Sequence, residues 1–165
     1  MRRRFLIPLL LALLSLLLYF LPYGESVANA DAIVVLDHVV DGDTVWVRSV
    51  YGFKAGQTFK VRLADVDTPE RGEPGFAEAT EEVNRILSSS PCIILDVDDP
   101  PYDRYGRVVA VVYVPEGNVL LNLNAHLAEN GFARYVDYSG SFHPEDFHLY
   151  VPVTEEIRGL IIRYC

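Results

Sequence analysis

Three short segments with a strand-like pattern at the start of the chain's globular part constrain the fold most strongly. Residues 32–40, 44–50 and 57–64 are rich in Val, Ile and other strand formers and are separated by turn residues. In the third segment, apolar residues alternate with Lys60 and Arg62. We therefore expect a three-stranded meander in which Arg62 faces away from the core.

The next segments add one helix and two further strands. An apolar stripe at helical spacing predicts a helix over 76–88, after a loop rich in Pro and Gly. Strands are predicted at 92–97 and 107–114, with a rigid acidic loop at 98–101. Three strands, a helix and two strands fit a mainly β, α+β fold in which a five-stranded OB-fold barrel is interrupted by a helix. The same order of elements also fits other small α+β folds.

The last third of the chain predicts two more helices, about three in all. One is expected at 120–130, closed by Gly131, and the other at 154–164. Between them, residues 132–138 are expected to add a short extended piece. The length fits a single domain at 31–165.

The N-terminus looks like a targeting segment. Three arginines precede an apolar run at 5–21, and Ala28-Asn29-Ala30 has the form of a signal-peptide cleavage site. Cleavage would make residues 1–30 a signal peptide and start the mature chain at Asp31. The alternative is an uncleaved membrane anchor, since 5–21 is just long enough to span a bilayer. Either interpretation places the domain outside the cytoplasm, as a secreted or membrane-anchored protein.

The domain is acidic. Residues 1–30 hold three of the 14 basic residues and one of the 23 acidic residues, so 11 basic and 22 acidic side chains remain. This balance argues against tight electrostatic binding of long duplex nucleic acid, which needs many basic phosphate contacts. A local basic site is still compatible with it.

The two cysteines, Cys92 and Cys165, allow two interpretations. They pair if an oxidising compartment and proximity permit it; otherwise one is a buried thiol and the other a terminal thiol. A zinc site is not expected, because the sequence has no C-x-x-C pair.

Carboxylates gather near the predicted strand ends. Asp43 closes the turn before one strand, and Asp67 follows another, so the two can share one cation if the strand ends are adjacent. Hard divalent ions prefer such oxygen ligands, and the carbonyl of Thr68 could add another. Glu70, three residues after Asp67, is placed to hold and polarise an attacking water. The structural alternatives are a hairpin turn at Asp43 and a helix-start acid at Glu70.

Two arginines complete this set. Arg62 projects from the outward face of its strand, and Arg107 follows a Tyr-Gly turn at the start of another. Guanidinium groups bind phosphate oxygens in a bidentate manner and stabilise charge during phosphoryl transfer. Taken singly, each could be a surface arginine paired with an acid. Together with the carboxylates, they predict phosphodiester cleavage assisted by a hard metal ion.

These segments closely resemble the staphylococcal nuclease (thermonuclease) family, over roughly residues 33–136. The matching stretches are 40–45, 61–63, 66–70, 75–79, 103–107 and 129–133. The resemblance implies an OB-fold nuclease that depends on Ca²⁺, acts on DNA and RNA and leaves 3′-phosphate products.

The same resemblance implies roles for individual residues. Asp43, Asp67 and the Thr68 carbonyl match the calcium ligands, while Arg62, Arg107 and Glu70 match the catalytic arginines and the proposed general base. Tyr105 lies beside this set. A monomer acting on single-stranded DNA or RNA is expected. The best-known relatives are basic, whereas this domain is acidic.

Two rival functions remain open. The acidic surface suits a non-catalytic, extracytoplasmic OB-fold module that binds protein or oligonucleotide. A calcium-stabilised structural domain would also use the carboxylates. The complete set of arginines and acids favours the nuclease, because a binding module has no need for Glu70.

Overall fold

The computed structural model describes residues 28–165 of the 165-residue chain. The apolar run at 5–21, with its predicted role as signal peptide or tether, lies outside the described residues. Within 28–165, no helix has the length and apolar character needed to cross a bilayer.

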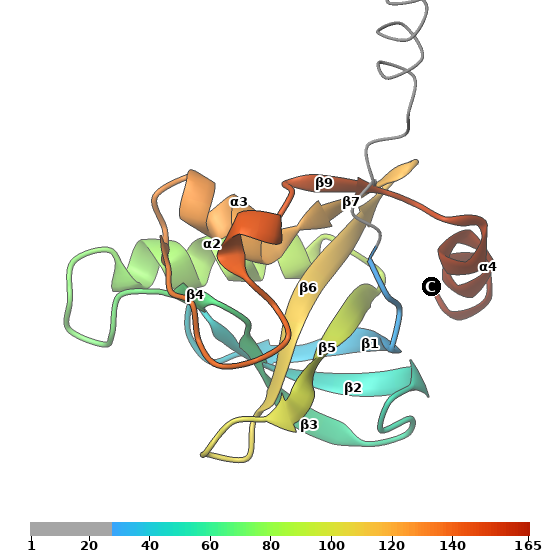
Figure 1. The fold of residues 1–165 in the computed structure, drawn as a ribbon, viewed down its shortest axis with the longest axis horizontal. Helices are drawn as coiled ribbons and strands as arrows, with labels where there is room; N and C mark the ends of the chain where they lie inside the picture. Colours follow the sequence, from blue (N-terminus) through green and yellow to red (C-terminus); the bar gives the residue numbers. More distant parts are fainter. Residues whose placement is uncertain (1–27) are drawn as a thin grey trace, which may run out of the picture.

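The described chain forms a small barrel with helices at its ends (Figure 1). In chain order, the strands and helices are β1 (Ala32–Val39), β2 (Thr44–Gly52), β3 (Thr58–Leu63), β4 (Val66–Asp67), α2 (Phe76–Ser88), β5 (Ile93–Tyr102), β6 (Val108–Glu116), β7 (Val119–Asn122), α3 (Leu123–Glu129), β8 (Arg134–Tyr135), a 3₁₀ turn (Pro144–Asp146), β9 (Tyr150–Pro152) and α4 (Glu155–Tyr164).

Five strands close the barrel. They run in the order β3-β2-β1-β5-β6, and β3 also pairs with β6 in parallel, so the sheet returns on itself. Strands β7 and β9 extend the sheet beyond β6, while β4 and β8 form a separate two-stranded ladder. The predicted OB-fold barrel with an interrupting helix is confirmed, and α2 spans the predicted residues 76–88.

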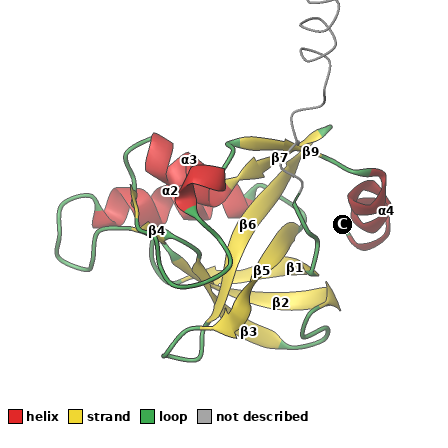
Figure 2. Cartoon of the chain, in the orientation of Figure 1, coloured by secondary structure: helices red, strands yellow, loops and turns green. Residues whose placement is uncertain are grey.

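Two apolar clusters hold the fold together. The first fills the barrel with inward side chains such as Val47, Val61 and Leu95, and α2 closes it with Val83 and Leu87. The second lies on the outside of the barrel, where α4 and β9 cover another face of the sheet. Figure 2 shows α2 and α3 together, with α4 set apart from them.

The structure corrects three sequence predictions. Strand β5 continues through the expected acidic loop at 98–101 and ends at Tyr102. The helix expected at 120–130 begins only at Leu123, because the residues before it form β7 and pair with β6 and β9. Strand β9 was not predicted. Strands β7 and β9 were missed because they form by pairing with segments distant in the sequence, and local periodicity carries no information about such pairing.

The cysteines pair. Cys92, directly before β5, forms a disulfide with Cys165 at the end of α4, with a Cα–Cα distance of 5.2 Å. The bond joins residues 73 positions apart. It therefore fastens α4 to the barrel at the second cluster, where Ile157 is buried.

Residues just before β1 pack on the domain. Ala28 is buried in the second cluster, and the backbone N–H of Asn29 donates to Asp96 Oδ2 at 2.9 Å. Burial raises the pKa of Asp96 to about 6, and the Asn29 bond only partly opposes this. Asp96 therefore binds its proton more tightly in the folded than in the unfolded chain.

Because the pKa of Asp96 is raised, we expect the substitution Asp96→Asn to increase folding stability in a pH-dependent way. The pKa of Asp96 is higher in the folded chain than in the unfolded chain. Protonated Asp96 therefore makes its full contribution to folding stability below about pH 4, and this contribution is lost as the pH rises through 6. At pH 8 we expect Asp96→Asn to be more stable than the parent by up to about 3 kcal/mol. At pH 4 the two should match. Thermal unfolding at both pH values measures the difference, and an advantage that is larger at pH 4 would contradict the assignment.

Candidate active site

Asp43 lies at the centre of the polar site, at the start of β2. The turn that precedes it is closed by a hydrogen bond from the Asp43 N–H to Asp41 Oδ1 at 3.2 Å. Its Oδ2 accepts from the Thr68 backbone N–H and from the Thr68 hydroxyl, both at 3.2 Å. Asp43 as a whole is only 7% exposed. Asp43 thus joins the β1–β2 turn to the segment after β4.

Gly42 permits this junction. A Cβ at this position would lie 2.8 Å from the Thr68 side chain and 2.9 Å from Cβ of Ala79 on α2. Side chains do not approach so closely, so the turn requires glycine. The Asp-Gly-Asp sequence therefore serves a close contact as well as a turn.

Arg62 links the two predicted metal carboxylates. Its Nη2 lies 3.2 Å from Asp43 Oδ2 and 3.4 Å from Asp67 Oδ1. Its Nη1 donates to the Leu63 carbonyl at 2.8 Å, and the guanidinium lies 5.9 Å from the centre of the Tyr138 ring. The predicted direction is confirmed, because the neighbouring Val61 and Leu63 fill the barrel core. Arg62 is nevertheless buried, because these groups surround it.

Arg107 reaches the same network from the loop between β5 and β6. Its Nη1 donates to Thr44 Oγ1 at 3.2 Å, and Thr44 Oγ1 in turn donates to Asp43 Oδ1 at 3.0 Å. Its Nε donates to Asp103 Oδ2 at 2.7 Å. Burial would raise the pKa of Asp103, but hydrogen bonds from Arg107 and from the Tyr105 backbone hold it below its usual value. Asp103 therefore holds Arg107 within the loop between β5 and β6 through hydrogen bonds to its backbone and side chain.

Glu70 lies in the same neighbourhood of the chain but outside this network. It is exposed in the loop between β4 and α2, and its backbone N–H donates to Glu73 Oε2 at 2.8 Å. Within the described residues, its carboxylate forms no hydrogen bond or ion pair. Of the six predicted site residues, five lie in the connected set around Asp43, and within the described chain Glu70 forms no hydrogen bond or ion pair with them.

Comparison with known proteins identifies the family of this chain. The profile described as "Staphylococcal nuclease homologue" matches residues 60–153, more than half of the chain. The chain belongs to this family. It is 33% identical over 125 residues to a thermonuclease of Staphylococcus hyicus, covering 72% of this chain and 68% of that protein.

Two further proteins are similar to this chain at about the same level of identity. A micrococcal nuclease of Shigella flexneri is 32% identical over 117 residues, and an uncharacterised protein of Methanocaldococcus jannaschii is 30% identical over 136 residues. Each of these matches covers 68% of this chain and 62% of the relative. The chain thus spans about three fifths of the length of these two relatives.

The donor set fits a hard cation. Asp43 and Asp67 each direct one carboxylate oxygen at the same Arg62 nitrogen, so the two carboxylates converge on one small region. In the described part of the chain, no three His, Cys, Asp or Glu side chains gather as a metal site. Two carboxylates would therefore need backbone carbonyl, water or phosphate oxygens to complete a coordination shell, which Ca²⁺ tolerates.

A third arginine, which sequence reasoning missed, lies at the edge of the site. Arg134 on β8 donates through Nε and Nη2 to Asp67 Oδ2, at 3.1 and 2.6 Å. Pairing of β4 with β8 places Asp67 directly opposite Arg134. Its side chain is 77% exposed, unlike that of Arg62. The sequence offered one signal for Arg134, its position just after the second predicted helix. That position does not indicate Asp67 as its partner.

The net pKa shift of Asp43 is opposite to that of Asp103. Removal from water raises the pKa of Asp43, and the charge of Arg62 opposes this rise. Asp41, two residues earlier, raises it further. A second cation beside Asp43 would therefore favour its ionised form.

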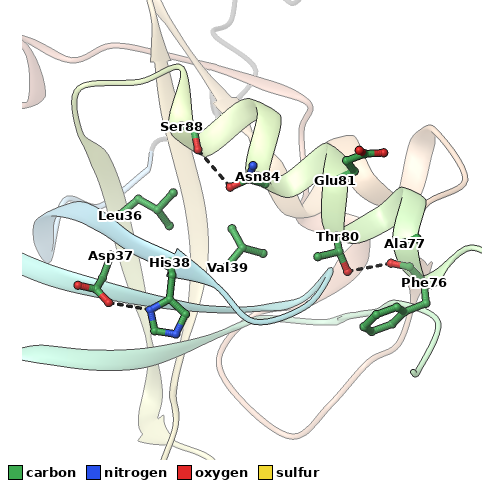
Figure 3. Close-up of a pocket in the computed structure, with 10 residues that line it drawn as sticks. All are labelled: Leu36, Asp37, His38, Val39, Phe76, Ala77, Thr80, Glu81, Asn84 and Ser88. Carbon is green, nitrogen blue, oxygen red and sulfur yellow. Dashed lines mark hydrogen bonds and ion pairs between the residues drawn. The ribbon is translucent and has the colours of Figure 1, made fainter. Parts of the chain in front are cut away.

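A groove lies apart from this network, between β1 and α2 (Figure 3). It encloses about 630 Å³ and is lined by both apolar and polar side chains. They are Leu36, Asp37, His38, Val39, Phe76, Ala77, Thr80, Glu81, Asn84 and Ser88. None of the six predicted site residues lines it.

Proposed function

We propose that this protein is an exported, Ca²⁺-dependent nuclease that hydrolyses phosphodiester bonds of DNA or RNA and leaves 3′-phosphate ends. One observation carries the proposal. Arg62 on β3 and Arg107 in the loop before β6 are both joined to Asp43, Arg62 by an ion pair and Arg107 through Thr44. Two guanidinium groups beside convergent carboxylates suit a phosphate that is held together with a cation.

The two arginines would bind the scissile phosphate. As negative charge builds on the equatorial oxygens during in-line attack, fixed guanidinium donors stabilise it without reorganising. The ion pairs of Arg62 with Asp43 and Asp67, and of Arg107 with Asp103, hold these donors in place. Arg107 keeps an exposed side, with 25% of its side chain accessible to a substrate.

Asp43, Asp67 and the Thr68 carbonyl would hold the metal ion. Bound Ca²⁺ would supply positive charge to the phosphate oxygens as a Lewis acid. Thr44 and Thr68 orient the Asp43 carboxylate by hydrogen bonds, so its oxygens face a defined direction. Glu70 would then orient or deprotonate the attacking water from its exposed loop.

Charge and covalent structure support the proposed substrate and location. The acidic domain favours single-stranded DNA or RNA over long duplexes, since few basic residues are available to neutralise phosphates. The disulfide supports an oxidising, extracytoplasmic location, either secreted or tethered through residues 5–21. We propose a monomer.

Digestion of a single-stranded oligonucleotide by the full-length chain tests the function. We expect cleavage with Ca²⁺, none with excess chelator, and a loss of about 10²- to 10⁴-fold in kcat for Glu70→Ala, because proton transfer contributes on that scale. Glu156→Ala, an exposed acid on α4, is the matched control. Unchanged turnover in Glu70→Ala would remove the assigned role of Glu70.

A folded, calcium-loaded chain that binds oligonucleotides but never cleaves them would support the second candidate. That candidate is the non-catalytic OB-fold binding module, which the excess of acidic residues favours. Calcium-dependent thermal stabilisation without either property would instead indicate a structural domain.

A further inference from the structure

The outer face of β1, β2 and β3 carries a row of aromatic and basic side chains that the proposed chemistry does not use. Trp46 on β2 lies opposite His38 on β1 and opposite Lys60 on β3. Its ring centre lies 6.1 Å from that of His38, at an interplanar angle of 27°, and 5.5 Å from Lys60 Nζ. We call these three residues, together with Arg48, the outer strip.

The outer strip is continuous with the proposed site. Side chains two residues apart on a strand share a face, so Trp46 follows Thr44 and Lys60 precedes Arg62 on the same outer surface. Thr44 and Arg62 are themselves direct partners across β2 and β3. One step along these strands, about 6–7 Å, therefore separates the phosphate-binding groups from Trp46 and Lys60.

Charge on this surface differs from that of the whole domain. Within the described residues, neither Arg48 nor Lys60 forms an ion pair, although the domain has twice as many acids as bases. Lys60 lies over the Trp46 ring instead. Within residues 28–165, the only carboxylate that forms a hydrogen bond or ion pair with the strip is that of Asp37, whose Oδ2 lies 2.7 Å from His38 Nδ1 and so orients the imidazole.

We propose that the outer strip binds the single-stranded nucleic acid substrate on one side of the cleaved bond, by stacking a base on Trp46 and pairing a phosphate with Lys60. Surfaces that combine aromatic rings with unpaired basic groups bind single strands without sequence preference. A base that stacks on Trp46 displaces the flexible Lys60 ammonium, which then reaches the adjoining phosphate. Arg48, one step further along β2, extends the track.

This inference rests on the proposed nuclease function. It predicts that the nuclease prefers longer oligonucleotides to short ones. A trinucleotide would fill the site around Arg62 and Arg107 alone. A longer strand would also contact the outer strip and bind more tightly. The preference should therefore appear in KM, with kcat unchanged.

The only tryptophan in the chain is Trp46, so its fluorescence reports directly on the strip. With the cleavage-impaired Glu70→Ala chain in Ca²⁺, we expect saturable quenching by an oligothymidylate of about 16 nucleotides. A trinucleotide should quench far less. Absence of quenching by the longer strand, at concentrations that compete for cleavage in the parent protein, overturns the proposal.

Substitutions then separate the strip from the catalytic groups. For the longer strand, we expect KM to rise about tenfold in Trp46→Leu and several-fold in Lys60→Gln, with a weaker salt dependence in Lys60→Gln, by about 0.7 in the log–log slope. Cleavage of the trinucleotide should stay at parent levels. Arg163→Gln, an exposed residue on α4 with the same change of charge, is the control.

The outcomes distinguish the two proposals. If Lys60→Gln weakens both substrates equally, or neither, the outer strip is not a separate binding track. Lys60→Gln keeps the test valid even if Trp46→Leu is unstable. If the parent chain cleaves nothing, the nuclease assignment fails, while quenching still decides whether the strip binds single strands.

Discussion

Replacing Arg107 with alanine should lower kcat/KM for oligonucleotide cleavage by about 10³- to 10⁵-fold. Arginines that stabilise charge on a transferring phosphoryl group contribute on this scale. Arg107 fits such a role, because its guanidinium is fixed by Asp103 and Thr44 at the edge of the proposed metal site. Single-turnover cleavage with saturating Ca²⁺ measures the effect on the chemical step.

The fold should survive this substitution. Arg107 lies in a loop and is partly exposed, so its removal empties no core position. Thermal unfolding of the variant should therefore stay within a few degrees of the parent. Arg163→Ala, which removes an exposed arginine from α4, should retain full activity. Near-normal cleavage by a stably folded Arg107→Ala protein would refute the assignment of the phosphate site.

Loss of the disulfide should destabilise the domain by about 4 kcal/mol. Cys92 and Cys165 are 73 positions apart, and a cross-link over a loop of that length removes much of the entropy of the unfolded chain. For a domain of this size, the melting temperature should fall by about 10 °C or more. Thermal unfolding with and without reductant, and of Cys165→Ser, measures the change.

The double variant Cys92→Ala, Cys165→Ser provides the control for this prediction. Reductant should not change its melting temperature, because no disulfide is left to break. A parent protein whose melting temperature is the same in oxidant and reductant would show that the cross-link does not support the fold. Activity near room temperature should change little, since the bond lies in the second cluster and not among the site residues.

Local pattern predicted the barrel well and the second half of the chain less well. Segments rich in strand-forming residues, with alternation in the third, located β1 to β3, and an apolar stripe located α2 at its observed limits. Residues 120–122 were assigned to the start of a helix, because their apolar side chains fit either period. Their partners, β6 and β9, decide that they form a strand, and no local signal identifies these partners.

The sequence allowed us to predict the part of the candidate site that lies at the ends of strands. Asp43, Arg62 and Asp67 could be placed together, because adjacent strands of a small barrel bring their ends to one place. Arg134 could not be, since its contact with Asp67 depends on a two-stranded ladder between distant residues. The disulfide was left open for the same reason. The role of Glu70 stays a prediction, because no hydrogen bond or ion pair of its carboxylate in the described residues tests it.

Close packing at Gly42 couples helix α2 to the turn that carries Asp43. A Cβ at Gly42 would lie 2.9 Å from Cβ of Ala79, a fully buried residue of α2, and 2.8 Å from the Thr68 side chain. A side chain larger than that of Ala79 would therefore press on this turn from the helix. We expect substitutions at Ala79 to shift the Asp43 carboxylate, and with it the geometry of the proposed cation site, from a position that provides no ligand.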